Sequence, residues 1–367
     1  MLITCDPGRK AWNTVMGPLR NPDPHGGLWL YAPGNPEANT WAKTKAKAKG
    51  PTKPQRLTLQ GYPEGHDFHP LGLEIYPSYG GNASNLFVVN HARHRTVIEQ
   101  FTLSPSTPTI ATWIRTLTSP YFISPNSIAL TSPTSFYVSN DHLLTRRLPS
   151  ILGHVLPLSE TILGLPLSWL SHISLEPNTT PSAPPTIHHT FSALGIPFAN
   201  GVALSPDRTQ VALAATSLNQ IYFYSRSPSS NVLKYMHTVP VPFSPDNVIF
   251  DEHGALIVTG HPHFPSLIVV AANKTDALAP SWVVSIAPRA RGADGEVLST
   301  LPAEYDLQAP ISASGKVSAV LSHEIETLFQ SNGTGFSSSS TGLLDSTTGT
   351  LYVTGLYAED GAMVCKP

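Results

Sequence analysis

The stretch "PDNVIFDEHGALIVTGHP" at residues 245–262 decides the fold. Its two apolar runs, separated by a short turn with Asp and Gly, predict the two strands of a tight hairpin. Asp246 and Asn247 stand just before the first run, and His261 stands just after the second. An acid, an amide and an imidazole therefore gather at one end of a buried β unit.

The same hairpin form recurs along the chain. Copies with an apolar strand, a turn and a second apolar strand occupy residues 71–90, 127–140, 201–216, 245–260 and 341–355. A third apolar strand follows most copies, as in "QIYFYSR" at 220–226. Antiparallel strand sets repeated about every 40–50 residues are typical of a β-propeller, whereas a β-sandwich is the alternative. We therefore predict an all-β fold in which residues 1–367 form a single β-propeller domain.

The first residues match the middle of this repeat. "MLITCDPG" at 1–8 resembles "ALIVTGHP" at 255–262, which is the second strand of a hairpin, and "GGLWLYAP" at 26–33 then fits a third strand. Together with the five hairpin copies, this partial copy predicts six blades. The first blade is predicted to lack its innermost strand.

Composition fits many short strands and limits the partners. Charged residues make up 13% of the 367 residues, well below the usual fraction, and 36 residues are Pro. The formal net charge of −2 gives no basis for a nucleic-acid or anionic-membrane partner. We expect a monomer that acts on a small molecule.

Oxygen-bearing side chains recur at the start of the innermost strands. Asn126 precedes "SIAL", Asn200 precedes "GVAL", and Asp246 with Asn247 precedes "VIF". Innermost strands line the central channel of a propeller, so these residues should meet at one mouth of it. Such oxygens suit Ca²⁺, whereas Zn²⁺ prefers His and Cys. Taken singly, each Asn is a common strand-end turn residue; the shared register favours a metal site.

A wider resemblance runs from about residue 67 to the end of the chain. The matching motifs, in order, are "DFHPLGLEIY", "LFVVNHARHRTVIEQF", "SPNSIALTSPTSFYVSNDH", "FANGVALSPD", "PDNVIFD", "VTGHP" and "GLYAEDGAMVCKP". On these motifs the chain resembles the serum paraoxonase/arylesterase family of six-bladed, calcium-dependent lactonases. "FYVSNDH" together with "FANGVALSPD" and "DNVIFD" is a fairly specific combination.

The resemblance implies roles for individual residues. The two Asn residues and the Asp–Asn pair named above fall where the family holds its catalytic Ca²⁺. Asp141, His142 and His261 fall on the active-site wall, and His91 falls on one member of a histidine pair. In the family, calcium binds the carbonyl or phosphoryl oxygen and stabilises the oxyanion as water attacks. The implied function is a calcium-dependent hydrolase of lactones and aryl esters.

The sequence also departs from the family pattern. The family's fifth calcium ligand, a glutamate, and a neighbouring aspartate lie on the innermost strand of blade one, and this sequence starts after that strand. Leu71 stands where the second histidine of the pair is expected, so a two-histidine relay cannot operate. Ser127 replaces an aspartate of the family's second calcium site. Cys365 matches the family's terminal cysteine, whose partner would lie upstream of Met1.

Two residues remain as the general base of such a reaction. His91 has a suitable pKa, and Asp246 is a carboxylate beside the expected water. We favour Asp246, because Leu71 leaves His91 without its orienting partner. Two other functions stay open: a non-catalytic propeller, which Leu71 favours, and a sugar-lactone hydrolase of the gluconolactonase type.

Residues 142–171 resemble the helical lid of the family, which contacts lipid surfaces. An apolar helix packed over the blades explains the same pattern. The apolar stretch 151–170 contains Pro157, Glu160 and Pro166, which argues against a membrane span and for a surface helix.

The location of the protein is left open by the sequence. Met1 leads directly into "LITC", without a signal peptide. A secreted or endomembrane protein is expected if a longer N-terminus carries such a segment. Glycosylation is permitted at the sequons of Asn82, Asn178, Asn273 and Asn332. Two cysteines allow at most one disulfide bond.

Overall fold

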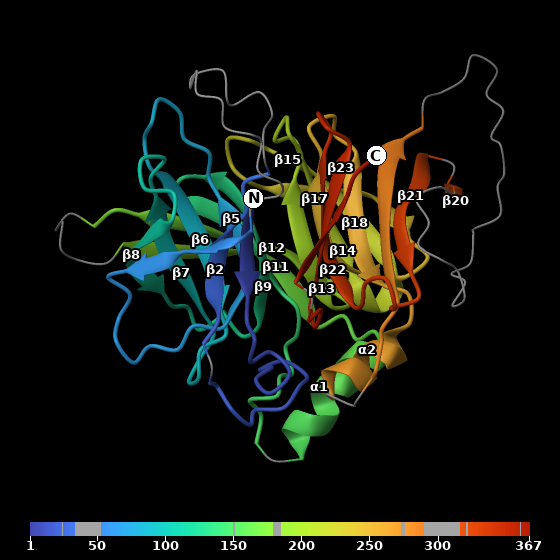
Figure 1. The fold of residues 1–367 in the computed structure, drawn as a ribbon, viewed down its shortest axis with the longest axis horizontal. Coiled ribbons are helices and arrows are strands. Elements are labelled where there is room, and N and C mark those ends of the chain that lie inside the picture. Colours follow the sequence, from blue (N-terminus) through green and yellow to red (C-terminus); the bar gives the residue numbers. More distant parts are fainter. Residues whose placement is uncertain are drawn as a thin grey trace. The chain divides into compact units, whose positions relative to one another are not determined.

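The chain folds as a six-bladed β-propeller with few helices, as predicted (Figure 1). This computed structural model describes residues 1–23, 25–33, 53–149, 151–178, 185–272, 276–289, 316–320, 322–359 and 361–367. Contacts divide the chain into two compact units. Unit 1 consists of Met1–Gly8 and Pro22–Thr118, and unit 2 consists of Arg9–Asn21 and Ser119–Pro367.

Unit 1 holds the first two blades. The strands of the first sheet, in spatial order, are β1 (Leu2–Cys5), β2 (Gly27–Leu30) and β3 (Gln55–Arg56). Those of the second are β5 (Pro70–Ile75), β6 (Ser84–Asn90), β7 (Val97–Leu103), β8 (Ile110–Leu117) and β4 (Thr58–Gln60). Among the described residues, β1 is the edge strand of its sheet and pairs with β2 alone. The first blade thus begins with the second strand of the repeat, as the sequence predicts.

Unit 2 holds four blades. In each sheet the strands are given from the innermost outward. The third blade consists of β9 (Pro125–Ser132), β10 (Ser135–Asn140), β11 (Ser168–Glu176) and β12 (Thr186–Ile196), and the fourth of β13 (Ala199–Leu204), β14 (Gln210–Ala215), β15 (Gln220–Arg226) and β16 (Leu233–Pro240). The fifth blade consists of β17 (Ser244–Phe250), β18 (Leu256–His261), β19 (Ser281–Pro288), β21 (His323–Ser331) and β20 (Lys316–Val320), and the sixth of β22 (Ser339–Asp345), β23 (Thr350–Gly355) and β24 (Ala362–Cys365). A short 3₁₀ turn, η2 (Thr216–Leu218), follows β14.

In the three blades that contain β10, β14 and β18, the second strand carries a continuous apolar run because it is buried on both faces. Every residue of β10 and of β18 is buried, and β14 is buried from Val211 onward. Strands buried on both faces read as continuous apolar runs, whereas half-buried strands alternate. β12 alternates between half-buried and exposed residues over most of its length, which fits an outer strand. The core therefore lies in the middle of the blades, and the innermost strands are left to carry polar groups.

Two helices lie at one end of the sheets of unit 2. Helix α1 (Leu152–Ile162) and helix α2 (Phe264–Ala271) sit side by side there, with the loop of residues 9–21 next to α1 (Figure 1). The predicted helical lid of residues 142–171 is shorter than expected. Its helix is α1 alone, and β11 already begins at Ser168, since Pro166 prevents the helix from continuing. None of the described helices has the length and apolar character that a membrane crossing requires.

Candidate functional site

Each candidate ligand lies in a β-bulge of an innermost strand. In β9, Pro125 pairs with Asn140 and Ile128 pairs with Val138, so two residues, Asn126 and Ser127, face one residue of β10. The strand β13 has the same bulge at Asn200 and Gly201, and β17 has it at Asp246 and Asn247. A bulge leaves its extra residue out of the ladder and redirects its side chain. The common register predicted from the sequence is therefore produced by a repeated irregularity.

The bulges of unit 2 lie next to one another. The Ser127 hydroxyl accepts a hydrogen bond from the Val202 backbone N–H at 3.2 Å, which joins β9 to β13. At Gly201, an added Cβ would lie 2.5 Å from Asn247 Cα and 2.7 Å from the Asp246 carbonyl oxygen, so β13 and β17 touch through their backbones. Only a glycine permits this approach.

A fourth innermost strand, β22, is joined to the bulge of β17. Asn247 Nδ2 donates to Thr341 Oγ1 at 3.0 Å, and Thr341 lies one residue past a single-residue bulge at Ser340. Four successive blades therefore bring polar side chains to one end of the unit.

The free oxygens of this group fit a cation of the calcium type. Asn126 and Asn247 each donate an amide hydrogen to a neighbour, which leaves their carbonyl oxygens without a donor among the described residues. Asn200 Oδ1 is buried and also lacks a hydrogen-bond partner. One oxygen of Asp246 accepts from His261, and no described residue donates to the other. Buried acceptors without donors are costly, and oxygen-only sets of this kind are the ligands that Ca²⁺ prefers.

Histidine–aspartate pairs support the bulges from behind. His261 Nε2 lies 3.0 Å from Asp246 Oδ2, and His261 Nδ1 is buried without a hydrogen-bond partner. Asp141 Oδ2 accepts from Asn126 Nδ2 at 2.9 Å, while Asp141 Oδ1 lies 3.1 Å from His142 Nδ1. Asp141 directly follows Asn140, which pairs with Pro125, and His261 directly follows Gly260, which pairs with Pro245. Each therefore stands one residue beyond the pair that precedes the bulge of its own blade, which explains the contact.

His142 is a supporting residue in this arrangement. Its side chain is fully buried, and its second ring nitrogen, Nε2, lies 2.7 Å from Thr161 Oγ1 in α1. The ring also packs edge-on against Phe198, with 4.4 Å between the ring centroids. Because both nitrogens are engaged, His142 fixes Asp141 rather than offering a base to solvent.

His91 and Leu71 belong to unit 1. His91 directly follows β6, is fully buried, and donates its backbone N–H to the carbonyl of His69 at 3.0 Å. Leu71 occupies the bulge of β5, the register position that Asn or Asp fills in the three blades of the ligand set. An aliphatic side chain can neither ligate a cation nor take a proton, so this blade contributes neither function through that position.

Three polar residues near the site were not anticipated. Tyr357 stands two residues after the end of β23, as His142 stands two residues after β10, so the register of the repeat could have revealed it. Its hydroxyl accepts from Asn13 Nδ2 at 3.2 Å. Burial raises the pKa of Tyr357; Arg9 and Asn13 lower it, and Asp246 raises it. Arg9 and Asn13 lie in the loop between β1 and β2, where no sequence pattern points to them.

A second group of possible ligands lies in unit 1. Ligand atoms of His25, Asp67 and His69 lie within 4.8 Å of one another. Burial raises the pKa of Asp67, but hydrogen bonds from Arg93 outweigh it, and the pKa is lowered overall. Because the Arg93 guanidinium already neutralises Asp67, this group is a poorer cation site than the bulges. His69 is in turn held by Asp6, with 3.1 Å between Nδ1 and Oδ2.

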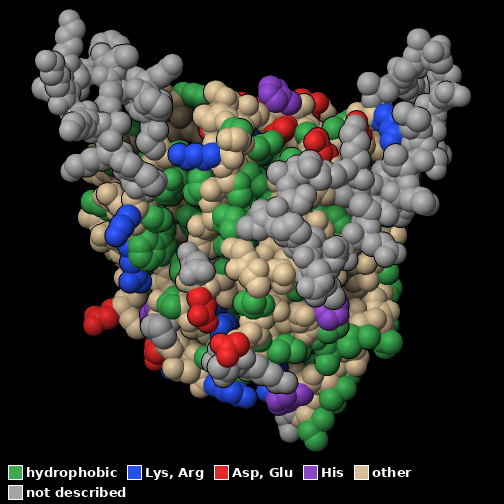
Figure 2. Space-filling view, turned by 45° about the vertical axis from the view of Figure 1, so that its right-hand side comes forward, with side chains coloured by type: hydrophobic (Ala, Val, Ile, Leu, Met, Phe, Trp, Pro, Cys, Tyr) green, Lys and Arg blue, Asp and Glu red, His purple; other side chains and the backbone are tan. Residues whose placement is uncertain are grey.

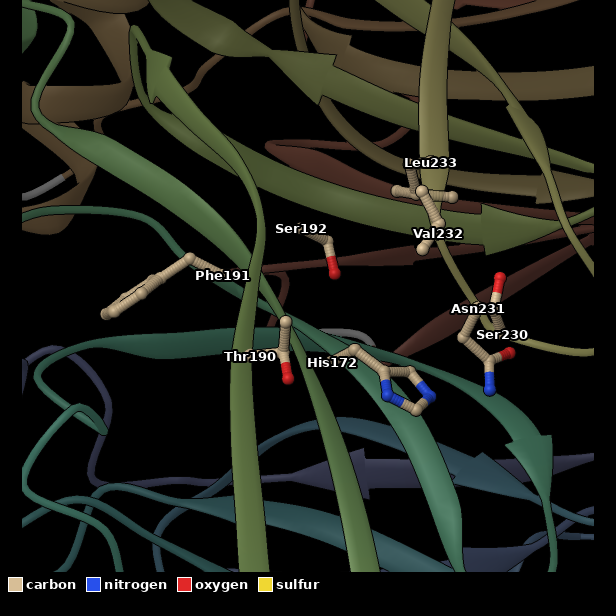
Figure 3. Close-up of a pocket in the computed structure, with 8 residues that line it drawn as sticks. All are labelled: His172, Thr190, Phe191, Ser192, Ser230, Asn231, Val232 and Leu233. Atoms are coloured by element: carbon tan, nitrogen blue, oxygen red, sulfur yellow. The ribbon is translucent and has the colours of Figure 1, made fainter.

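A separate pocket lies on the side of unit 2 (Figure 3). It is lined by His172, Thr190, Phe191, Ser192, Ser230, Asn231, Val232 and Leu233. None of these residues belongs to an innermost strand, and none is a carboxylate. Burial lowers the pKa of His172 to about 4, so its imidazole is neutral at pH 7. The candidate ligands therefore lie elsewhere than this pocket.

The cysteines and sequons add little to the site. Cys5 and Cys365 are both free thiols, so the one disulfide bond that the two cysteines allow is not formed in this structure. Asn82 and Asn178 are exposed and Asn332 is half-buried, whereas Asn273 lies outside the described residues.

The fold and the site together define a class of protein, a six-bladed propeller whose inner bulges present a set of side-chain oxygens. Comparison with known families identifies the family: residues 22–304 match the one described as Arylesterase, and the chain belongs to it. It is 25% identical over 203 residues to serum paraoxonase/arylesterase 2 of Bos taurus, which covers 55% of this chain and 51% of the relative. It is 27% identical over 197 residues to serum paraoxonase/arylesterase 1 of Homo sapiens, with 53% and 50% covered. The chain thus spans about half the length of these relatives.

Solved structures resemble the fold more distantly. The periplasmic gluconolactonase of Pseudomonas aeruginosa aligns with a TM-score of 0.46 and 10% identity, over 100% of this chain and 77% of the other. A gluconolactonase of Xanthomonas campestris aligns with a TM-score of 0.39 and 15% identity, over 77% and 69%. Similarities at this level carry no information about the reaction.

Proposed function

We propose that this protein is a calcium-dependent hydrolase of lactones and aryl esters. The observation that carries the proposal is the set of donor-free oxygens in three neighbouring bulges, with the buried Asn200 Oδ1 as its clearest member. Membership of the arylesterase family supports the same reading. The names of the relatives include both arylesterase and lactonase, which points to the same ester chemistry.

The residues that would hold the cation are those of the bulges: Asn126, Asn200, Asp246 and Asn247. Bound there, Ca²⁺ would act as a Lewis acid toward the carbonyl oxygen of the substrate. The protein's own contribution is to hold the amide oxygens in place, through Asp141 for Asn126 and through Thr341 for Asn247. Ligands that are hydrogen-bonded in this way need little rearrangement on binding.

The proton of the attacking water goes to Asp246 in this proposal. Its carboxylate lies at the ligand set, and its Oδ2 is hydrogen-bonded to His261, which orients the group. His261 is almost fully buried, so the pair is shielded from bulk water. The alternative base, His91, lies in unit 1. A non-catalytic propeller remains the competing function, and Leu71 in the bulge of β5 is the observation that favours it.

Calcium binding tests the site without requiring turnover. Titration calorimetry of the chelator-treated protein should show one Ca²⁺ site, weakened by Asp246→Ala because ligand charge sets calcium affinity. Asn200→Leu should also weaken binding, since it removes one buried oxygen. Ser244→Ala, on the same strand as Asp246 but outside the bulge, serves as the control. An unbound protein, or equal affinity in wild type and Asp246→Ala, rules out the proposed site.

We also propose that α1 contacts lipid surfaces. Exposed apolar side chains, here called the lid patch, gather on α1 and at its two ends, at the end of the molecule where Figure 2 shows hydrophobic atoms at the surface. The lid patch consists of Ile151, Leu152, Val155, Leu158, Ile162 and Leu163. α1 has no basic residue in its last turn and no acidic residue in its first, so the contact should depend on apolar burial rather than on lipid charge.

Changing the lid patch should abolish vesicle binding and leave the fold intact. We expect the combined variant Ile151→Ser, Leu152→Ser and Ile162→Ser to lose co-flotation with neutral phosphatidylcholine vesicles. Each of these side chains is more than half exposed, so the variant should unfold at a temperature close to that of the wild type. Tyr79→Ser removes a side chain that is 82% exposed outside the patch and should bind vesicles normally. Equal flotation of all three proteins contradicts the proposal.

A further inference from the structure

Among the described residues, Arg9 is a buried cation without an ion-pair partner. Only 7% of the residue is exposed, and its Nε and Nη1 atoms are buried and donate to no described acceptor. No carboxylate of the described residues forms an ion pair with it. Buried guanidinium groups are normally paired, because removal of a charge from water is costly. A buried guanidinium group without a paired carboxylate therefore calls for an explanation of what offsets its charge.

The position of Arg9 places it near the proposed metal ligands. Arg9 and Asp246 both act on the hydroxyl of Tyr357, Arg9 by lowering its pKa and Asp246 by raising it, against the larger effect of burial. The same hydroxyl accepts from Asn13. Tyr357 follows Gly355, which pairs with Ser339 beside the bulge of β22, and Thr341 of that strand accepts from Asn247. The loop of Arg9 therefore reaches the end of unit 2 where the proposed ligands lie.

The loop that carries Arg9 is fixed on two sides. On one side, Lys10 forms an ion pair with Glu359 at 2.8 Å, beside the contact between Asn13 and Tyr357. On the other side, the Val15 carbonyl accepts from the Arg146 backbone N–H at 2.8 Å. Asn13 Oδ1 also accepts from the backbone of residues 15 and 16, which closes a turn. The guanidinium is thus held by a structured loop rather than by a free chain end.

A structural role as countercharge to Asp246 is the competing explanation. In that case the two groups should pair directly, but Asp246 Oδ2 bonds to His261 instead, and no ion pair joins Asp246 to Arg9. Calcium at the ligand set would also engage the Asp246 charge. Of the described charged groups in this region, Arg9 would then be the one left unpaired.

We propose that Arg9 binds an anionic group, a carboxylate or a phosphate, carried by the ester or lactone substrate. This inference rests on the proposed function and adds a preference for negatively charged substrates. A guanidinium suits both anions because its planar fork of N–H donors matches their oxygens in pairs. Arg9 lies outside residues 22–304, the part of the chain that matches the arylesterase family.

Substrate discrimination tests the inference. Hydrolysis of phenyl acetate, 4-acetoxybenzoate and 4-acetoxyphenyl phosphate would be compared at saturating Ca²⁺ in the wild type, Arg9→Lys and Arg9→Met. Arg9→Met should lower kcat/KM for one or both charged esters, relative to phenyl acetate, by roughly 10- to 100-fold. Arg9→Lys should keep part of the preference. The two charged esters distinguish a carboxylate from a phosphate site.

A binding measurement separates this inference from the proposed function. Sodium 4-acetamidobenzoate, a carboxylate without an ester, should raise the unfolding temperature of the wild type but not of Arg9→Met. Without ligand, Arg9→Met should be at least as stable as the wild type, because it removes an unpaired buried charge. If no ester is hydrolysed but this Arg9-dependent shift is seen, only the proposed function fails. If Arg9→Met is destabilised, or all three esters are affected equally, Arg9 is structural and the inference fails.

Discussion

Asp246→Asn should lower ester and lactone turnover by roughly 10²–10⁴-fold. The change keeps the size and hydrogen-bonding shape of the side chain, yet a carboxamide cannot accept the proton of the attacking water. It also removes the one negative charge among the four proposed ligands, so calcium affinity should fall at the same time. Turnover should therefore be measured over a range of calcium concentrations, so that the loss of the ion and the loss of the base can be separated.

His91→Gln is the matched control for this experiment. If Asp246 is the base, His91→Gln should change turnover little and leave calcium binding intact. A fall of 100-fold or more in His91→Gln, with unchanged calcium affinity, would identify His91 as the base and contradict the assignment to Asp246. His261→Gln provides a third point, since it removes the group that orients Asp246 but leaves the ligand set unchanged.

Gly201→Ala should disrupt both stability and calcium binding. The new methyl group would lie 2.5–2.7 Å from Asn247 Cα, the Asp246 carbonyl oxygen and the Val248 nitrogen. These are backbone atoms and cannot rotate away, so β13 and β17 must separate. We expect the free energy of unfolding to fall by about 3 kcal/mol, and calcium affinity to fall because Asn200 moves away from Asp246. Denaturant unfolding and calorimetry measure the two effects.

Gly61→Ala adds the same methyl group where nothing lies within 4 Å. Its only cost is the positive φ of 74°, worth about 1 kcal/mol, and calcium affinity should not change. If Gly201→Ala behaved like Gly61→Ala, the two bulges would not be in contact.

The blades and their register could be predicted because burial leaves a strong pattern in the sequence. The second strands are buried on both faces and read as apolar runs. The ends of these strands could therefore be placed at Asn140 and Gly260, and this alignment put Asn126 and Asp246 at the same position of the repeat. The edge position of β1 followed from the same alignment. Helix α1 was placed too broadly, because the resemblance covered residues 142–171 as one segment, whereas the helix begins at Leu152 and ends at Ile162.

Contacts between residues far apart in the chain could not be predicted. The bulges were missed because Asp246 and Asn247 look like residues before a strand, whereas they lie within β17. Arg9 and Asn13 were missed because the contact with Tyr357 joins two loops without any repeat pattern. The position of His142 on the site was implied by resemblance, but only the structure shows that both of its nitrogens are engaged.

The contact between Asn13 and Tyr357 has a consequence for the order of folding. Its partners are 344 residues apart in the chain. At synthesis rates of about 5–20 residues per second, the loop of Arg9 leaves the ribosome tens of seconds before its partner. Closing so long a loop costs entropy that nearby contacts do not. During synthesis the Arg9 guanidinium must therefore stay in water, and the proposed anion site can be completed only after β23 has emerged.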